Sequence, residues 1–530
     1  MNKMFLKTIL SAVLTVSAAL MLAAAPKSEA QFDRLVKTYT LHPDGSQELR
    51  VQKQLTVYTH AAMNSLYGET FIVYDPSYQE LKINESYTRQ TDGTIVRTPE
   101  NAFVEVLPSA AADAPAYNGL REMVVVHTGL ELGATIFLDY TLVTKAGVVP
   151  ALDIFEEVEE LSPIRNYTLS ISVPEGTPLH YGMINGKSAP SVKVSDGVKT
   201  VSWNLKNVRP RPRSLAVSVQ AGNVQAITAT TYSSEQEFAG VLGDQQYSAD
   251  DPAVTARIEE MNAGRSDRRS VVDKIHEYIS RELAQCRLTF VQTGYKVRPA
   301  AEVIGSAYAT DAERTLLASA MLKAVGVSSD VLMALPKAED PLSTGYASLV
   351  DILATGFVNA SDDATADISD YLEIIGMDGQ VAEVASPVHT ECSETSVEVQ
   401  ADSSKMIADG IYAFSLPENS SWLARVYPYT TSNTARQVNL LLPYTADETH
   451  SYVLEVKDGL EPLALPEPVD ISNPVGSMKV EVTESGTRID IVCRLEINEQ
   501  LVTPAMYPQY YKLMSEWHEL YSSPLVFGVR

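Results

Sequence analysis

The sequence predicts a multidomain α+β protein in which two β-sandwich-like domains flank an α+β core. Three observations support this fold class. Residues 36–230 are short β-rich runs separated by turn signals, residues 252–325 carry helical periodicity, and β-rich runs return from about residue 394. Runs of strands followed by runs of helices are typical of α+β folds or of separate domains. A chain of 530 residues has room for about three domains.

The first thirty residues have the pattern of a secretory signal peptide. Lys3 and Lys7 precede an uncharged apolar stretch over residues 9–25, and Ser28 and Ala30 supply the small residues that a cleavage site needs. We therefore expect cleavage after Ala30 and an exported protein, in the periplasm, on the cell surface or secreted. An uncleaved membrane anchor is the alternative. No later segment has eighteen consecutive apolar residues, so we expect no membrane span in the mature chain.

Residues 31–235 form the expected N-terminal β-sandwich-like domain. Two β-rich runs, 36–42 and 48–58, flank the hairpin signal Pro43-Asp44-Gly45. Similar turn signals recur along the domain. Trp203 lies in a run of alternating apolar and polar residues, which predicts that its side chain points into the core. The basic cluster Arg209–Arg213 is interpreted as a solvated, extended connector.

The expected core covers residues 236–390. Behind a polar stretch at 232–252, the pattern predicts helices over 252–262, 266–284 and 311–325, and Gly326 stands where a helix C-cap is favoured. A buried strand is expected at 331–335 and a further strand at 371–374. The final domain, 391–530, is expected to contain β-strands and a terminal helix over 507–521 that holds Trp517.

Charge and composition exclude several classes of function. The formal net charge is −26, which makes nucleic acid an unsuitable partner because it is itself negative. The acidic loop 359–370 does not match the spacing of a calcium-binding EF-hand, and one His and one Cys near residue 390 are too few for zinc. We therefore expect no cofactor and no metal. Cys286, Cys392 and Cys493 leave open whether one pair forms a disulfide.

Several short stretches occur in a characteristic order: Asp44-Gly45-Ser46, Tyr74-Asp75-Pro76 with Glu80–Ile83, Asp92-Gly93, Gly129–Tyr140, Arg298–Val303, Leu316–Val327 and Pro504–Tyr511. In these stretches and in the order of its segments, the chain resembles bacterial exported transglutaminase-like proteins of the papain-like superfamily, which carry an uncharacterised β domain before their core. This resemblance implies a catalytic Cys at a helix N-terminus, a His on a following strand and an Asp on the next. A thiolate there is stabilised by helix N–H groups and by a neighbouring imidazolium.

The residues at the three catalytic positions depart from the family pattern. Counting back from Leu316-Leu317 places Thr310 at the position of the Cys, and Ala354 or Thr355 falls at the His. Glu373 falls at the Asp. No cysteine occurs between residues 287 and 391, and no histidine between 277 and 388. We therefore expect no catalytic residue at these positions, and a candidate cleft formed by Tyr308, Thr310, Asp311 and Glu313.

Thr310 has three interpretations. Thr310-Asp311-Ala312-Glu313 fits the capping box S/T-x-x-E, which stabilises a helix start. The hydroxyl could instead contact a ligand, or act as a nucleophile if a base lies within hydrogen-bond reach. The capping interpretation is preferred because the usual base, the His, is missing.

These observations predict a pseudoenzyme: a transglutaminase-like protein that binds a peptide, a glycan or a cell-envelope protein as a scaffold without turning it over. The first alternative is an active cysteine peptidase, amidase or acyltransferase that uses displaced residues, with Cys286 and His389 as the candidate pair. Cys286 lies at the C-terminal side of a predicted helix, where the negative end of the helix dipole raises the pKa of a thiol. The second alternative is a structural or adhesive β protein whose central domain is a spacer.

Overall fold

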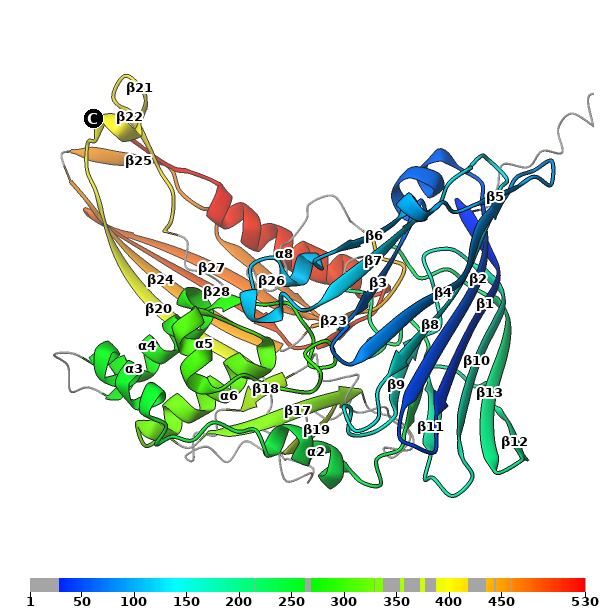
Figure 1. Ribbon diagram of the computed structural model, residues 1–530. Coiled ribbons are helices and arrows are strands. Elements are labelled where there is room, and N and C mark those ends of the chain that lie inside the picture. Colours follow the sequence, from blue (N-terminus) through cyan, green and yellow to red (C-terminus); the bar gives the residue numbers. More distant parts are fainter. Residues whose placement is uncertain are drawn as a thin grey trace, which may run out of the picture.

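The computed structural model describes residues 28–214, 216–262, 268–327, 329–336, 353–356, 372–376, 388–417, 435–442, 445–457 and 459–529. The chain is mostly β and multidomain, with several sheets (Figure 1). Most of the helices fall in one green block, which in Figure 1 lies below the orange C-terminal strands and to the left of the blue N-terminal strands. The expected signal segment up to residue 27 and the acidic loop 359–370 lie outside the described residues.

An eight-stranded sheet dominates the N-terminal domain. In spatial order its strands are β12 (Ser191–Ser195), β13 (Val198–Val208), β10 (Ile164–Pro174), β1 (Ala30–Leu41), β2 (Gln47–Val57), β8 (Thr135–Thr144), β4 (Gln79–Arg89) and β5 (Ile95–Arg97). β1 and β10 pair in parallel, whereas the other neighbours are antiparallel. The turn between β1 and β2 is the predicted hairpin, and Gly45 adopts a φ of 86° there.

Two three-stranded sheets pack inside the curve of the large sheet (Figure 1). One consists of β11 (His180–Ile184), β14 (Ala226–Thr230) and β9 (Asp153–Glu157), and the other of β3 (Glu69–Tyr74), β7 (Arg121–Val126) and β6 (Phe103–Val106). Alternate residues of β10 and β13 point inward, so that Tyr167, Leu169 and Trp203 join Ile154 and Ile227 in one core. The inward position of Trp203 is therefore confirmed.

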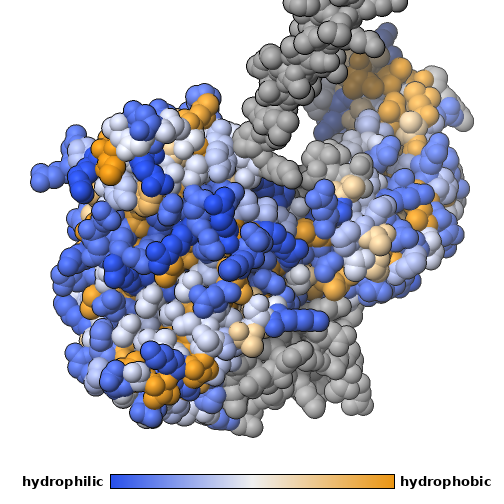
Figure 2. Space-filling model, turned by 90° about the vertical axis from the view of Figure 1, so that its right-hand side faces the viewer, coloured by the Kyte–Doolittle hydropathy of each residue, from blue (hydrophilic) through white to orange (hydrophobic). Residues whose placement is uncertain are grey.

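The face turned toward the viewer in Figure 2 is mostly hydrophilic, with hydrophobic side chains scattered among polar ones. Short helical turns connect the strands: η1 (Ala62–Leu66), η2 (Glu100–Ala102), η3 (Ser109–Ala111) and η4 (Pro115–Tyr117). The last two lie within residues 107–120, which join β6 to β7. This segment is called the β6–β7 loop below.

The middle of the chain contains α2 (Glu235–Gly243), α3 (Pro252–Asn262), α4 (Arg268–Glu277), α5 (Ala300–Ser306) and α6 (Asp311–Ala324). The second predicted helix is shorter than expected, because α4 passes into the π-helical turn η5 (Tyr278–Glu282). α2 was not predicted. Its sequence is polar, but Ser234 caps it by accepting a hydrogen bond from the Glu237 amide, and Phe238, Ala239 and Leu242 are buried.

Two small sheets accompany these helices. β15 (Ala284–Gln285) and β16 (Tyr308–Ala309) pair in parallel. β17 (Asp330–Pro336) lies between β18 (Leu353–Gly356) and β19 (Leu372–Gly376), antiparallel to both. The strands predicted at 331–335 and 371–374 correspond to β17 and β19 within one or two residues.

The C-terminal region contains a five-stranded and a four-stranded sheet. The first is β20 (Val388–Val399), β24 (Thr445–Val456), β28 (Arg488–Ile497), β27 (Gly476–Ser485) and β26 (Val469–Asn473), and the second is β21 (Met406–Ala408), β22 (Ile411–Phe414), β30 (Leu525–Val529) and β25 (Leu460–Ala464), with η9 (Ser403–Lys405) before β21. β23 (Leu440–Leu441) pairs with β29 (Leu501–Val502). The predicted terminal helix is α8 (Tyr507–Ser522), and Trp517 on it packs into the sheet core.

The N-terminal and C-terminal regions contact each other directly. Asn223 Nδ2 donates to the carbonyl of Asn439 over 3.0 Å, and Asn439 Nδ2 donates to the carbonyl of Ala221 over 2.8 Å. Throughout the described ranges, every helix is too short or too polar to cross a membrane.

Candidate functional site

The N-terminus of α6 is closed by its own side chains. Thr310 Oγ1 accepts a hydrogen bond from the Glu313 amide over 3.3 Å, and Glu313 Oε2 accepts one from the Thr310 amide over 2.9 Å. This reciprocal pair is the predicted capping box, which is confirmed. Two backbone amides at this helix start, those of Thr310 and Glu313, are thus bonded to the carboxylate and the hydroxyl.

A buried ion pair completes this arrangement. Arg298 Nε and Nη2 each donate to a different Glu313 carboxylate oxygen, both over 2.9 Å, and the Arg298 amide donates to Oε1 over 2.9 Å. The side chain of Glu313 has no exposed surface, and that of Arg298 is 9% exposed. The remaining guanidinium donors reach Ser306 Oγ and the carbonyl of Tyr308. A bidentate pair with these further bonds keeps both buried charges compensated.

The pKa of Glu313 reflects this balance. Burial alone would raise it, but the hydrogen bonds from Arg298, the backbone amide of Thr310 and the charge of Arg298 together hold the pKa below its usual value. The carboxylate is therefore charged at neutral pH, and its negative charge stands at the positive end of the helix dipole.

The β6–β7 loop of the N-terminal domain covers this helix start (Figure 1). Tyr117 Oη donates to Glu313 Oε1 over 3.1 Å, and the Ala116 amide donates to Tyr308 Oη over 2.8 Å. The guanidinium carbon of Arg298 lies 4.3 Å from the ring centre of Tyr308 and 5.5 Å from that of Tyr117. These distances allow cation–π attraction to both rings.

Apolar contacts extend the cover. A cluster of buried residues joins the β6–β7 loop to the segment after β15, and it consists of Ala111, Ala114, Leu120, Cys286, Leu288 and Tyr308. Polar and apolar contacts thus both attach the N-terminal domain to the place where the resemblance puts the nucleophile.

The four residues of the candidate cleft have different environments. Tyr308, Thr310 and Glu313 are buried, whereas Asp311 is exposed and accepts a hydrogen bond from Gln285 Nε2 over 2.8 Å. All four lie at one helix start, but only Thr310 and Glu313 bond to each other, while Asp311 points to Gln285 on the surface.

The other two predicted positions fall on the small sheet beside α6. In β18, Ala354 pairs with Leu332 and Thr355 with Val331. Glu373 in β19 pairs with Leu335, on the opposite edge of β17. The side chains at these positions lie outside the described residues.

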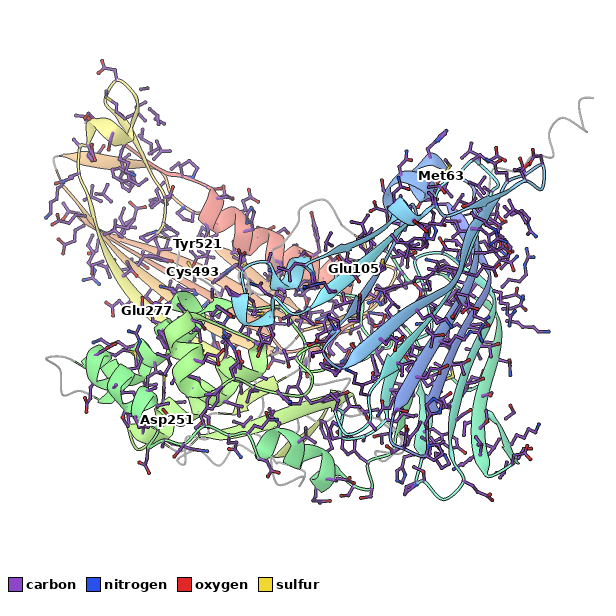
Figure 3. All side chains as sticks on the ribbon, viewed as in Figure 1. Met63, Glu105, Asp251, Glu277, Cys493 and Tyr521 are labelled. Atoms are coloured by element: carbon purple, nitrogen blue, oxygen red, sulfur yellow. The ribbon has the colours of Figure 1, made fainter. Side chains whose placement is uncertain are left out.

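All three cysteines are free, so the structure contains no disulfide among them. Cys286 is buried, its Sγ lies 3.8 Å from the carbonyl of Ala110, and burial raises the pKa of its thiol. Cys493 is buried in β28 near Tyr521, and burial raises its pKa to about 12 (Figure 3). Cys392 is exposed. A thiol with a raised pKa forms little thiolate at neutral pH and is a weak nucleophile.

His389 lies in β20, where it pairs with Ala446, and its side chain is not among the described ones. The described residues also contain a buried polar cluster around one histidine, His450, that was not predicted from the sequence. Ser393 Oγ lies 2.8 Å from His450 Nδ1, and His450 Nε2 lies 3.5 Å from Glu448 Oε2. Because His450 and Glu448 are fully buried next to α8, we interpret this cluster as a packed polar group of the sheet.

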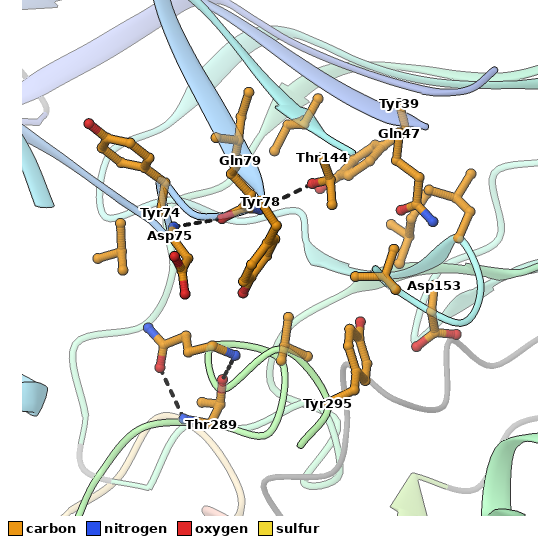
Figure 4. A pocket seen from close by; sticks show the side chains of 18 of the residues that line it. Tyr39, Gln47, Tyr74, Asp75, Tyr78, Gln79, Thr144, Asp153, Thr289 and Tyr295 are labelled. Atoms are coloured by element: carbon orange, nitrogen blue, oxygen red, sulfur yellow. Dashed lines mark hydrogen bonds between the residues drawn. The ribbon is translucent and has the colours of Figure 1, made fainter. Parts of the chain in front are cut away.

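A pocket lies between the N-terminal domain and the loop before α5 (Figure 4). Its volume is about 400 Å³. None of Tyr308, Thr310, Asp311 and Glu313 lines it. The lining residues are Tyr39, Gln47, Glu48, Leu49, Val73, Tyr74, Asp75, Tyr78, Gln79, Leu120, Leu142, Thr144, Val149, Leu152, Asp153, Ile154, Phe155, Thr289, Val291, Gln292 and Tyr295. This pocket could not be predicted from the sequence, because its walls come from segments far apart along the chain.

Among the residues that the structure describes, no group of three or more His, Cys, Asp or Glu side chains is arranged to hold a metal ion.

Comparisons with known proteins give two domain matches. Residues 43–212 match DUF3857 and residues 410–527 match DUF3858, each described as a domain of unknown function with a solved structure. A comparison with curated proteins finds no match.

Among solved structures, the chain is similar to the crystal structure of a "putative protease" from Parabacteroides distasonis, with 36% sequence identity and a TM-score of 0.78. That similarity covers 94% of this chain and 99% of the other. An M1 zinc metallopeptidase from Deinococcus radiodurans is 12% identical over 38% of this chain and 42% of its own, with a TM-score of 0.19, which is too low to support an argument.

Removing the charge of Glu313 should destabilise the chain strongly. In Glu313→Gln the buried Arg298 loses its counter-charge, which costs about 3–5 kcal/mol of unfolding free energy. Thr310→Ala removes one capping bond and should cost about 1 kcal/mol. Urea unfolding followed by circular dichroism measures both, with Glu302→Gln on the exposed side of α5 as the matched control. Equal effects of Glu313→Gln and Glu302→Gln would contradict the role of the ion pair.

The same variant gives a pH test. Because the folded pKa of Glu313 is lowered, its stabilising contribution is fully present above the unfolded pKa of about 4.3 and is lost as pH falls through the folded value. The stability difference between wild type and Glu313→Gln should therefore be constant between pH 7 and about pH 5 and shrink below about pH 4. A difference that grows on acidification would show that the carboxylate is not stabilised in its charged form.

Proposed function

The chain belongs to the family of the crystallised "putative protease" from Parabacteroides distasonis. Within that family, we propose that this chain is an exported binding or assembly scaffold. Its transglutaminase-like α+β core catalyses no reaction. Its partner is a peptide, a glycan or a protein of the cell envelope. The proposal assigns the core a structural task and assigns ligand binding to surfaces and pockets between the domains.

One observation carries this proposal. The helix start where the resemblance places the nucleophile holds Thr310, whose hydroxyl accepts from the Glu313 amide within a capping box. A nucleophilic hydroxyl needs a base within hydrogen-bond reach, and the family's His position holds Ala354 or Thr355, neither of which can accept a proton at neutral pH. Tyr117 occupies the adjacent space from the N-terminal domain.

Burial of the helix start also supports the proposal. Thr310 is 3% exposed and Glu313 is fully buried. A peptide substrate must place its scissile carbonyl about 3 Å from a nucleophile. Here that approach would require the β6–β7 loop to leave, together with its hydrogen bonds to Tyr308 and Glu313.

The second candidate function is an active cysteine peptidase, amidase or acyltransferase with Cys286 and His389 as the pair. The description of the crystallised relative as a "putative protease" favours it. The burial of Cys286 and its raised pKa argue against it, because the thiolate is the nucleophilic form.

Turnover separates the two candidates. Purified chain is incubated with mixed peptides and amine donors, beside Thr310→Ala and thiol-alkylated chain, and products are followed by mass spectrometry. We expect no cleavage or cross-linking in any sample. Activity that alkylation abolishes would support the cysteine enzyme, and activity lost only in Thr310→Ala would identify Thr310 as a nucleophile.

Counting the cysteines that react with iodoacetamide tests separately whether the Cys286 thiol is accessible. Iodoacetamide should modify Cys392 in the native chain and all three cysteines after unfolding in urea, because Cys286 and Cys493 are buried. Rapid native labelling of Cys286, detected in the peptide map, would show that this thiol is accessible and ionised, as the second candidate requires.

A further inference from the structure

We propose that the pocket between the N-terminal sheets and the loop before α5 binds a protonated primary amine on an apolar stem, such as a lysine side chain within a peptide. This inference rests on the proposed binding function and adds to it the location of the site and the chemistry of its ligand. The cluster at Thr310 is not involved.

The size and position of the pocket suit a small ligand or one side chain of a larger one. Its volume of about 400 Å³ falls within the usual range for ligand sites, which occur preferentially where domains meet. One wall comes from the ends of β1 to β4, β8 and β9, and the other from residues 289–295 (Figure 4). Gly294 allows this close approach: a Cβ there would lie 3.2 Å from Tyr78 Oη.

The charged side chains that line the pocket are all acidic. Glu48, Asp75 and Asp153 contribute three carboxylates, and none of the described residues that line the pocket is lysine, arginine or histidine. Basic groups also lie nearby. Lys145 Nζ donates to the carbonyl of Ser77, and His42 Nε2 lies 3.7 Å from Glu48 Oε2. Arg121, which pairs with Tyr74 between β3 and β7, donates from Nη1 to the carbonyl of Leu120 over 2.8 Å.

His42 can offset the charge of Glu48 when it is protonated. Asp75 Oδ1 accepts a hydrogen bond from the Ser77 amide over 2.9 Å, and among the described residues no basic side chain forms an ion pair with Asp75. The pocket therefore repels anions and attracts cations.

Aromatic rings supply the second element of recognition. Tyr39, Tyr74, Tyr78, Tyr295 and Phe155 line the pocket together with aliphatic side chains. A cation near a tyrosine ring gains attraction from the ring quadrupole, and the aliphatic walls can bury the carbons of a lysine stem. This combination selects an ammonium ion on an apolar chain over a fully hydrated cation.

The polar side chains of the pocket are already ordered. Gln79 receives a hydrogen bond from the Asp75 amide and donates to Thr144 Oγ1 over 3.1 Å. Gln292 and Thr289 form a reciprocal pair across the opposite wall, at 3.0 and 3.2 Å. Ordered walls reduce the entropy lost on binding.

The field of the carboxylates reaches the tyrosines. Burial raises the pKa of Tyr78 to about 12, and the charge of Asp75 adds to that shift. Burial also raises the pKa of Tyr295, with a further contribution from Asp153. Both hydroxyls stay protonated at neutral pH and can donate hydrogen bonds, while the rings stay neutral.

The test is calorimetric titration of the purified chain with three blocked tripeptides that differ at the central residue: lysine, norleucine or glutamate. We expect the lysine peptide to bind at least about tenfold more tightly than the norleucine peptide, a difference of about 1.4 kcal/mol, and the glutamate peptide not to bind. Asp75→Asn and Asp153→Asn should each weaken lysine-peptide binding at least about tenfold.

Two variants serve as matched controls. Asp75→Glu keeps the charge and should retain binding. Asp196→Asn makes the same chemical change in the exposed turn between β12 and β13, where φ is 54° and asparagine is well tolerated, and should leave binding unchanged. Circular dichroism of each variant establishes that it is folded.

No binding of the lysine peptide, equal binding of the norleucine peptide, or binding unaffected in both Asp→Asn variants would overturn the pocket assignment. Mass spectrometry of the same samples keeps this outcome distinct from failure of the proposed function. Intact peptides without binding refute the pocket alone, whereas cleaved or cross-linked peptides refute the scaffold.

Discussion

The arrangement of the domains around α6 depends on the buried ion pair between Arg298 and Glu313. Two charges without access to water are tolerated only when every donor and acceptor has a partner. Here the partners come from three parts of the chain: the segment before α5, the start of α6, and the β6–β7 loop through Tyr117. Satisfying one carboxylate therefore fixes the positions of two helix starts and attaches the N-terminal domain to them.

The same interaction bears on function. A helix start that binds a catalytic thiolate must keep its amides free and its approach open. In this chain the amides of Thr310 and Glu313 are bonded within the capping box, and the loop covers them. The tyrosine- and carboxylate-lined pocket lies on another surface of the same loop, where Leu120 contributes to its wall. Closure of one site thus coexists with an open site next to it.

Local signals predicted the elements well, and contacts between distant segments account for what was missed. The capping box and Gly326 are local signals that each involve only a few neighbouring residues, so both ends of α6 could be predicted from the sequence. α2 was missed because its burial of Phe238 depends on packing against the core. Arg298 stands fifteen residues from Glu313, and the sequence does not indicate that they pair. The pocket is lined both by Asp75 of the N-terminal domain and by Tyr295 of the loop before α5. Sequence patterns do not indicate that these two segments lie side by side.

The most direct measurement is the labelling rate of a thiol introduced at the covered position, Thr310→Cys in a Cys392→Ser background. If the helix start is a closed structural cap, iodoacetamide should label this cysteine far more slowly than it labels exposed Cys392 in the wild type, and adding Tyr117→Ala should accelerate the labelling. The chain should remain without peptidase or cross-linking activity. Labelling as fast as that of an exposed thiol, or activity gained on introducing the cysteine, would contradict the account.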